Sequence, residues 1–186
     1  MTKYILHGGN TKELNEDNNG FFREMTLGLP GRVHVLLNYF SRLDSEIEEC
    51  AKEDKRRLLK NSQNKDLSFE IADPQKFIDQ LKKCNIMYMR GGDSAKLIKM
   101  MSPFSDLKEL FKNKVIVGSS AGVYVMTRYY WENDTGILGE GLGILNFKVY
   151  CHYNPNDINI VNKLQEYKEN LPLLTLPNCK WVIFYQ

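Results

Sequence analysis

Apolar and polar residues follow one another in blocks that fit short strands alternating with helices. The first half of the chain has dense or alternating apolar runs typical of strands at residues 3–6, 33–40 and 67–71. Its predicted helices cover residues 20–27, 44–60 and 75–83, and the polar stretch 13–19 is expected to be a loop. Asp73 is a natural cap for the third of these helices, and Pro74 suits its first position.

The second half repeats this rhythm more regularly. Predicted strands cover residues 85–89, 115–117, 144–153 (as one or two segments), 173–176 and 181–185. Predicted helices cover residues 94–101, 106–112, 121–130 and 157–170. Because the strand runs are nearly all apolar and alternate with helices, we expect an α/β fold: a three-layer, mostly parallel sheet with helices on both faces.

Glycine-rich turns mark the ends of three predicted strands. They are Gly8-Gly9, Gly91-Gly92 and Gly118–Gly122. Active sites in sheets of this kind lie beyond the carboxyl ends of the strands. We therefore expect a functional site where these turns meet.

Composition narrows the functional classes. The 186 residues are 42% hydrophobic and 26% charged, which predicts a soluble globular protein with one domain over residues 1–186. A formal net charge of +2 gives no electrostatic argument for nucleic acid binding. The sequence has neither an apolar run long enough to span a membrane nor a signal peptide, so we expect a cytoplasmic protein. Because its cysteines lack Cys-x-x-Cys spacing and its histidines do not cluster, we expect free thiols, no metal and no cofactor.

Gly118-Ser119-Ser120-Ala121-Gly122 carries the candidate chemistry. A Gly-x-Ser-x-Gly motif alone occurs by chance in on the order of a few per cent of chains of this length. Here it lies between a predicted strand and a predicted helix, a setting that lifts a serine hydroxyl out of the sheet on a strained turn. The flanking glycines allow close backbone approach, and the start of the helix can stabilise an oxyanion. Ser120 is therefore the candidate nucleophile.

A serine nucleophile needs a base, and the candidates are the three histidines of the chain. His34 lies inside an apolar run and is expected to pack there. His7 lies on the first glycine turn and could line the pocket, but no partner for it is evident. His152 follows the run 147–151 at a strand end, where a catalytic base belongs. We therefore favour His152.

A carboxylate that orients the histidine is expected between the serine and the histidine. The acids of this segment are Glu132, Asp134 and Glu140, and Asp134 lies in a polar turn that it could equally serve alone. The order Ser, Asp, His matches the α/β-hydrolases. However, the segment is too short for the additional strands and helices of that fold, so we expect the same serine turn on a different architecture.

The motifs taken in order resemble the peptidase E family of serine peptidases, which includes aspartyl dipeptidases and cyanophycinases. The resemblance rests on Gly91-Gly92-Asp93-Ser94 before a helix, on the serine turn, and on a strand that ends in Cys151-His152-Tyr153, and it covers nearly the whole chain. It implies a flavodoxin-like sheet related to class I glutamine amidotransferases. It also implies Ser120 as nucleophile, His152 as base, the N–H groups of Gly92 and Ala121 as oxyanion hole, and Asp134 as third member with Glu140 as its rival. Residues expected to contact the substrate are Gly91, Asp93 and Ser119.

The chain departs from the family pattern in two places. Asp93 and Ser94 stand where Asn and then Thr or Gln are usual. Aspartyl dipeptidases have arginines after the histidine that could bind an acidic side chain, whereas residues 153–171 contain only Lys163 and Lys168 as cations. The sequence therefore gives no support for an N-terminal aspartate preference, and the likeness is closer to another branch of the family. The chain also ends directly after an apolar run, so we expect it to be truncated at the C-terminus.

Three functions remain open at this point. The first is a serine peptidase that hydrolyses short peptides, like a dipeptidase, through a Ser-His-Asp/Glu triad and an acyl-enzyme. The second is another serine acyl hydrolase, an esterase or amidase, that uses the same site. The third is a non-catalytic binding protein that keeps the fold, which the altered turn at Asp93-Ser94 favours. The expected partner is a short peptide substrate, and a homodimer stays open.

Overall fold

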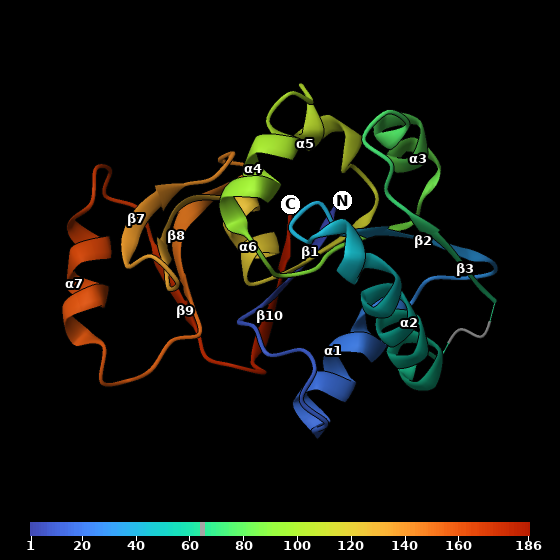
Figure 1. The fold of residues 1–186 in the computed structure, drawn as a ribbon, viewed down its shortest axis with the longest axis horizontal. Coiled ribbons are helices and arrows are strands. Elements are labelled where there is room, and N and C mark those ends of the chain that lie inside the picture. Colours follow the sequence, from blue (N-terminus) through green and yellow to red (C-terminus); the bar gives the residue numbers. More distant parts are fainter. Residues whose placement is uncertain (64–65) are drawn as a thin grey trace.

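The larger of two sheets forms the centre of the molecule (Figure 1). The structure is a computed structural model that describes residues 1–63 and 66–186. The strands of this sheet are β1 (Lys3–His7), β2 (Val33–Asn38), β3 (Leu67–Ile71), β4 (Ile86–Met89), β5 (Val115–Ser119) and β10 (Trp181–Tyr185). Their order is β10-β1-β5-β4-β2-β3, and β10 is antiparallel to β1 while all the others are parallel.

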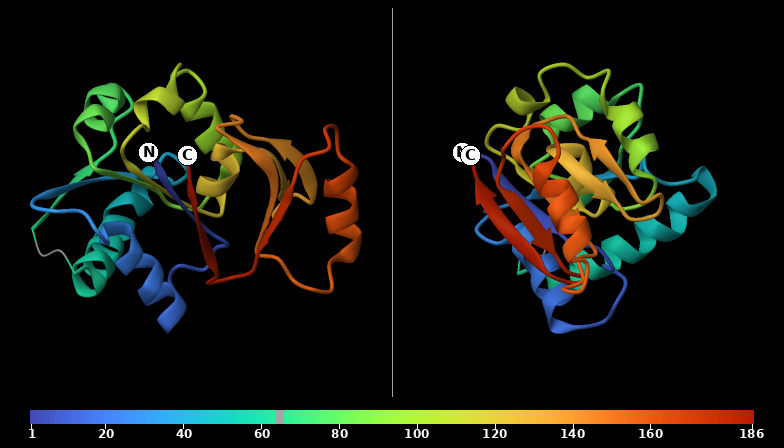
Figure 2. Two further views of the ribbon diagram at one scale, coloured as in Figure 1. Left: turned by 180° about the vertical axis from the view of Figure 1, so that it is seen from behind. Right: turned by 90° about the vertical axis from the view of Figure 1, so that its left-hand side faces the viewer.

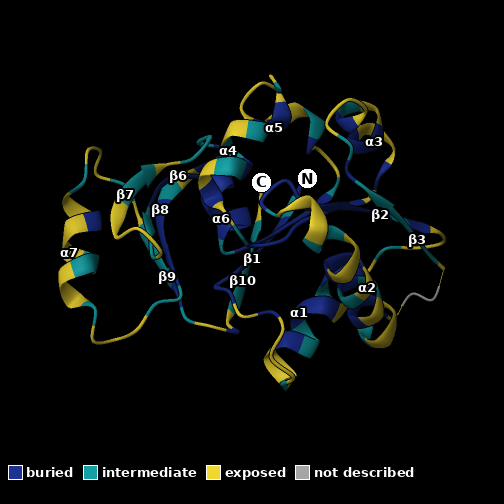
Figure 3. Ribbon diagram, in the orientation of Figure 1, coloured by how far each residue is buried: buried dark blue, intermediate teal, exposed yellow. Residues whose placement is uncertain are grey.

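Helices cover both faces of this sheet, as expected, because successive residues of each buried strand point to opposite faces. Helices α1 (Glu16–Thr26) and α2 (Asp44–Asn61) pack on the face that carries Leu37 and Tyr88. The opposite face, which carries Leu36 and Met87, is covered by α3 (Phe77–Lys83), α4 (Ser94–Met101), α5 (Leu107–Leu110) and α6 (Ala121–Met126). The strands between these layers are largely buried (Figure 3). The predicted α/β class, with a mostly parallel sheet and helices on both faces, is confirmed.

A second sheet stands beside the first and was not foreseen (Figure 2). Its strands are β6 (Thr127–Glu132), β7 (Ile137–Glu140), β8 (Leu145–Cys151) and β9 (Leu173–Leu176), in the order β7-β6-β8-β9. Only β7 is antiparallel to its neighbour. The inner face of this sheet joins the core around α6, and its outer face packs against α7 (Ile158–Glu166) through Tyr129, Tyr150 and Leu164.

The helix predicted over residues 121–130 is wrong in its second half, because α6 ends at Met126 and β6 begins at Thr127. Aromatic and β-branched residues in this segment suit a strand. Tyr129 packs on the outer face of the second sheet and Tyr130 on the inner face, which is the alternation of a strand. Strand β7 was missed. It contains Gly139 directly opposite Tyr130, where the tyrosine ring fills the space that a side chain would need.

Several predicted boundaries also shift. Helix α1 begins at Glu16, inside the stretch predicted as a loop, because Asn15 caps it by accepting a hydrogen bond from the N–H of Asn18. Asp73 accepts from the N–H of Gln75 in a turn, so Pro74 is not the first residue of α3, which begins at Phe77. Helices α5 and α7 are shorter than their predicted ranges. In the described part of the chain, no helix is long and apolar enough to cross a membrane.

Candidate active site

Ser120 stands in a sharp turn between β5, which ends at Ser119, and α6, which begins at Ala121. Its backbone has φ 49° and ψ −108°, a combination that costs a non-glycine residue on the order of 1–3 kcal/mol. The neighbouring glycines provide space: a Cβ on Gly118 would lie 2.4 Å from the carbonyl oxygen of Gly122, and one on Gly122 would lie 2.3 Å from that of Met89. Helix α6 therefore packs directly on the backbone of β4 and β5, which holds the turn in place.

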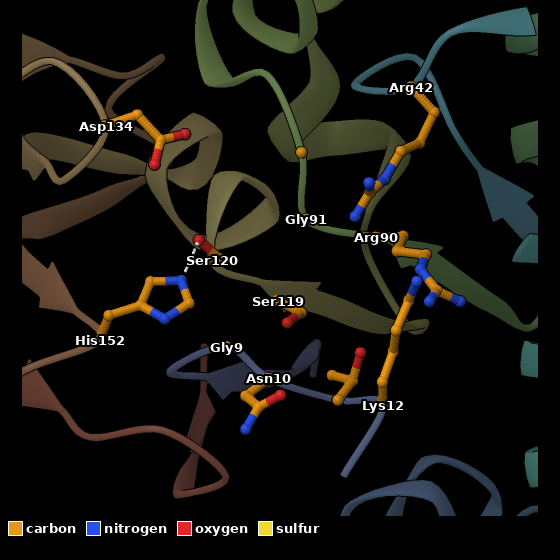
Figure 4. A pocket seen from close by; sticks show the side chains of 12 residues that line it. Gly9, Asn10, Lys12, Arg42, Arg90, Gly91, Ser119, Ser120, Asp134 and His152 are labelled. Carbon is orange, nitrogen blue, oxygen red and sulfur yellow. Dashed lines mark hydrogen bonds between the residues drawn. The ribbon is translucent and has the colours of Figure 1, made fainter. Parts of the chain in front are cut away.

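His152 faces this serine from the end of β8 (Figure 4). Its Nε2 lies 2.9 Å from Oγ of Ser120, and its Nδ1 lies 2.6 Å from Oδ1 of Asn178, in the loop between β9 and β10. An amide oxygen can only accept, so we assign the ring proton to Nδ1. Nε2 then has a free lone pair directed at the serine hydroxyl, as a general base requires.

Asn178, rather than the expected Asp134 or Glu140, is therefore the partner of His152. Asp134 lines the pocket near Ser120, but among the described residues no hydrogen bond joins it to His152 (Figure 4). The turn of Asp134 is anchored by Asn133, whose Nδ2 donates to Tyr124 Oη at 3.0 Å and to the carbonyl of Cys151 at 2.9 Å.

Glu140 does not take the predicted role of orienting His152 either. It lies at the end of β7 and its carboxylate accepts a hydrogen bond from Lys168. Glu132, the remaining acid of this segment, accepts from the hydroxyl of Ser94, and burial raises the pKa of its carboxyl group. The three acids thus have other positions or partners, and the contact predicted for Asp134 is made by an amide.

The glycine turn after β4 borders the serine. A Cβ on Gly91 would lie 3.0 Å from the carbonyl oxygen of Ser119 and 3.2 Å from Cβ of Ser120, so a side chain there would crowd the serine turn. Gly92 has φ 154°, in the region that favours glycine, and its backbone lies against Ser41. Ala121 is the first residue of α6, so its N–H has no partner within the helix.

The structure divides the remaining predicted substrate contacts. Ser119 lines the pocket together with Gly91 and Gly92. Asp93 does not line it, because its side chain caps α4 by accepting from the N–H of Lys96 at 2.8 Å. The residue next to the glycine pair therefore serves the helix instead of the pocket.

The pocket around Ser120 has a volume of about 240 Å³ and a cationic side that the sequence did not indicate. Lys12, Arg42 and Arg90 line it opposite His152 (Figure 4). The guanidinium of Arg90 is buried and paired with Asp54 and Glu53, each at 2.6 Å. The Nη1 of Arg42 lies 3.5 Å from Oε1 of Glu46, whereas its Nε is buried and has no hydrogen-bond partner among the described residues.

The sequence carries a signal for Asn178 and for two of the pocket cations. Asn178 follows the predicted strand 173–176, so the rule that functional residues stand at strand ends applied to it as well. The expectation of a carboxylate between the serine and the histidine excludes Asn178, which is an amide and follows His152 in the sequence. Lys12 and Arg42 follow β1 and β2 in the same way. Within the described residues, no group of His, Cys, Asp and Glu side chains could hold a metal ion.

Comparisons with known proteins bear on the family and the fold of the chain. A sequence-family model described as Peptidase family S51 matches residues 44–186. Among solved structures, the chain is similar to a peptidase from an acI-B1 actinobacterium, with a TM-score of 0.72, 16% identity, and coverage of 99% of this chain and 83% of that one. It is also similar to a protein designated as a peptidase E from Listeria monocytogenes EGD-e, with a TM-score of 0.69, 16% identity, and coverage of 99% and 94%. At this identity the two likenesses establish the fold. No curated protein matches the chain.

Proposed function

The chain belongs to peptidase family S51, and on this premise we propose that it is a serine peptidase that hydrolyses short peptides with Ser120 as nucleophile and His152 as base. The single observation that carries the proposal is the 2.9 Å contact between Nε2 of His152 and Oγ of Ser120 in the pocket. The strained backbone of Ser120 between a strand and a helix, a nucleophile elbow, supports it.

In the proposed reaction, His152 accepts the hydroxyl proton of Ser120 as Oγ attacks the peptide carbonyl carbon. The C–N bond then breaks, and the imidazolium gives its proton to the leaving amine. Water hydrolyses the resulting acyl-enzyme ester by the same steps, with His152 again as base, and the serine hydroxyl is restored. We assign the oxyanion hole to the N–H groups of Gly92 and Ala121. One well-placed donor of this kind contributes about 3 kcal/mol to transition-state stabilisation.

Asn178 takes the orienting role in this proposal. Its Oδ1 fixes the His152 tautomer, as the asparagine of Cys-His-Asn proteases does. A neutral amide gives less stabilisation to the imidazolium than a carboxylate would, so the contribution of Asn178 is chiefly orientation. Asp134 is then available at the pocket for the α-ammonium group of a peptide.

The pocket favours a small substrate with charges at both ends. Its volume of about 240 Å³ lies below the usual range for drug-sized ligands. Lys12 and Arg42 on one side can attract a carboxylate, and Asp134 on another can attract an ammonium group. A dipeptide carries both groups close to its scissile bond. We therefore favour dipeptides over simple esters as substrates.

The test compares hydrolysis of a dipeptide panel, with free and with blocked termini, against a panel of simple esters. We expect free dipeptides to give the highest kcat/KM and blocking of either terminus to lower it. Turnover of esters alone would indicate a different acyl hydrolase. Absence of all turnover, together with measurable peptide binding, would indicate a binding protein.

A further inference from the structure

One short turn at the end of β1 holds the three segments that form the site. Three consecutive carbonyl groups of this turn each accept one backbone hydrogen bond. The carbonyl of His7 accepts from the N–H of Ser120 at 3.0 Å, and that of Gly8 accepts from the N–H of His152 at 2.8 Å. The carbonyl of Gly9 accepts from the N–H of Cys179, which follows Asn178, at 2.9 Å. These segments come from β5, β8 and the loop after β9. The position of this turn therefore sets the relative positions of the serine, the histidine and its partner.

The same turn also supports the ring of His152 directly. A Cβ on Gly9 would lie 2.1 Å from Cε1 of His152, so the imidazole rests against bare backbone. Gly9 has φ 111°, which favours glycine as well. A shift of Gly9 would consequently move the ring that faces Ser120.

The side chain of His7 braces this turn from the interior. The N–H of Gly9 donates to Nδ1 of His7 at 3.0 Å, so the ring proton is on Nε2, which donates to Oδ1 of Asn18 at 2.8 Å. Asn18 in turn donates from Nδ2 to the carbonyl of Asn10 at 3.0 Å. Residues 7–10 are thus tied together through one ring and one amide.

His7 is itself unsuited to act as a base. Its ring is fully buried and packs on Phe21 with ring centroids 4.3 Å apart. The lone pair of Nδ1 is already engaged by Gly9, and Nε2 carries the proton. Both ring nitrogens of His7 nevertheless make a hydrogen bond. A residue that only filled space in the core would not need these bonds.

We propose that His7 is a positioning residue that places the imidazole of His152 against Ser120 through the Gly8-Gly9 turn. This inference rests on the proposed function, since the placement matters for catalysis only if Ser120 is the nucleophile. It goes beyond the proposed function because His7 touches neither substrate nor reacting atoms.

Two matched variants separate this role from simple packing. His7→Asn can place an oxygen near the position of Nδ1 and so keep an acceptor for Gly9, whereas His7→Phe keeps a ring without any acceptor. We expect His7→Asn to retain kcat within about fivefold, and His7→Phe to lower kcat by roughly 10²-fold with KM changed less than about threefold, as for a misplaced catalytic group. Equal kcat values for the two variants at similar melting temperatures would overturn the proposal.

A spectroscopic measurement on the same proteins keeps the inference testable without activity. In ¹⁵N-labelled protein, the ring signals of the three histidines can be assigned by substitution. We expect His7 to carry its proton on Nε2, and the His152 signals to be preserved in His7→Asn but shifted in His7→Phe. A proton on Nδ1 of His7, or His152 signals unchanged in both variants, would overturn it. If the parent protein hydrolyses no peptide while these shifts appear as expected, the proposed function fails and the positioning survives.

Discussion

Ser119 and Ser120 are neighbours in sequence, and each has a histidine ring near its hydroxyl. The Oγ of Ser120 lies 2.9 Å from Nε2 of His152, and that of Ser119 lies 3.5 Å from Nδ1 of His7. Both serines line the pocket, but Ser119 and His7 are buried, whereas Ser120 and His152 are partly exposed. The nitrogen of His152 that faces Ser120 has a free lone pair. The nitrogen of His7 that faces Ser119 already accepts a hydrogen bond from the N–H of Gly9.

The difference shows what a base needs besides proximity. A general base must have an unused lone pair, and it must be able to carry a positive charge during the reaction. Burial lowers the pKa of His7 to about 4, although the bond to Asn18 partly opposes this effect, so its charged form is strongly disfavoured. His152 is only partly buried and has Asn178 behind it. We therefore assign the reaction to the pair of Ser120 and His152. The pair of Ser119 and His7 has a structural role.

The largest expected effect comes from removing each hydroxyl in turn. Ser120→Ala should lower kcat/KM for a dipeptide by at least about 10⁴-fold, because the covalent step is lost. Ser119→Ala, the matched control one residue away, should stay within about fivefold. Steady-state kinetics on both variants measures the loss of kcat/KM. A larger loss for Ser119→Ala than for Ser120→Ala would make Ser119 the nucleophile instead of Ser120.

Removing the partner of His152 should give the next largest effect. Asn178→Ala leaves Nδ1 of His152 without its acceptor, so we expect kcat to fall by roughly 10²- to 10³-fold with little change in KM. Asp134→Asn provides the matched comparison and should affect KM more than kcat. A greater loss of kcat for Asp134→Asn would restore Asp134 as the orienting residue.

The lowered pKa of His7 should also change how the stability of the protein depends on pH. The ordinary histidine pKa is about 6.5. Because the folded-state pKa of His7 is about 4, the unfolded chain binds the proton more readily between these values. The stability that neutral His7 contributes is therefore present above pH 6.5 and is lost as the pH falls toward 4. The charges that bear on this ring belong to His152, Arg57 and Asp17.

Urea unfolding at pH 7 and pH 5 measures this contribution. We expect the free energy of unfolding of the parent to fall by roughly 2 kcal/mol more over this range than that of His7→Asn, which has no group to titrate there. An equal fall for the two proteins would contradict the depressed pKa of His7.

The smallest expected effect concerns the cationic side of the pocket. Arg42→Ala should raise KM for a free dipeptide about tenfold while kcat changes little. The reason is that the lost contact binds the substrate equally well in the ground state and in the transition state. The same variant should affect a C-terminally amidated dipeptide less. An equal effect on both substrates would show that Arg42 does not bind the terminal carboxylate.

Strand-end reasoning found the parts of the site whose position depends on local sequence. Ser120 and His152 each follow an apolar run at a strand end, although β5 belongs to the first sheet and β8 to the second. Hydrogen bonds from both residues to the turn after β1 bring these two strand ends together. Asn178 escaped because its loop reaches His152 only through the pairing of β8 with β9, a contact that no local pattern encodes. The second sheet escaped for a related reason, since the run 121–130 looks like one helix until Tyr129 and Tyr130 are seen to pack on opposite faces.

The segment outside the matched family region adds a further lesson. Residues 44–186 match the family model and supply the serine, the histidine and Asn178. The turn at His7–Asn10 and the cations Lys12 and Arg42 come from the first 43 residues. The proposed catalytic residues and the turn that positions them therefore come from different parts of the chain. The backbone hydrogen bonds of the turn after β1 join these two parts.

The most direct test of the central claim is to label the parent, Ser119→Ala and Ser120→Ala proteins with a fluorophosphonate probe and to locate the adduct by peptide mass spectrometry. We predict a single adduct on Ser120 in the parent and in Ser119→Ala, and none in Ser120→Ala. Labelling of Ser120→Ala at the rate of the parent, or an adduct on Ser119, would contradict the account.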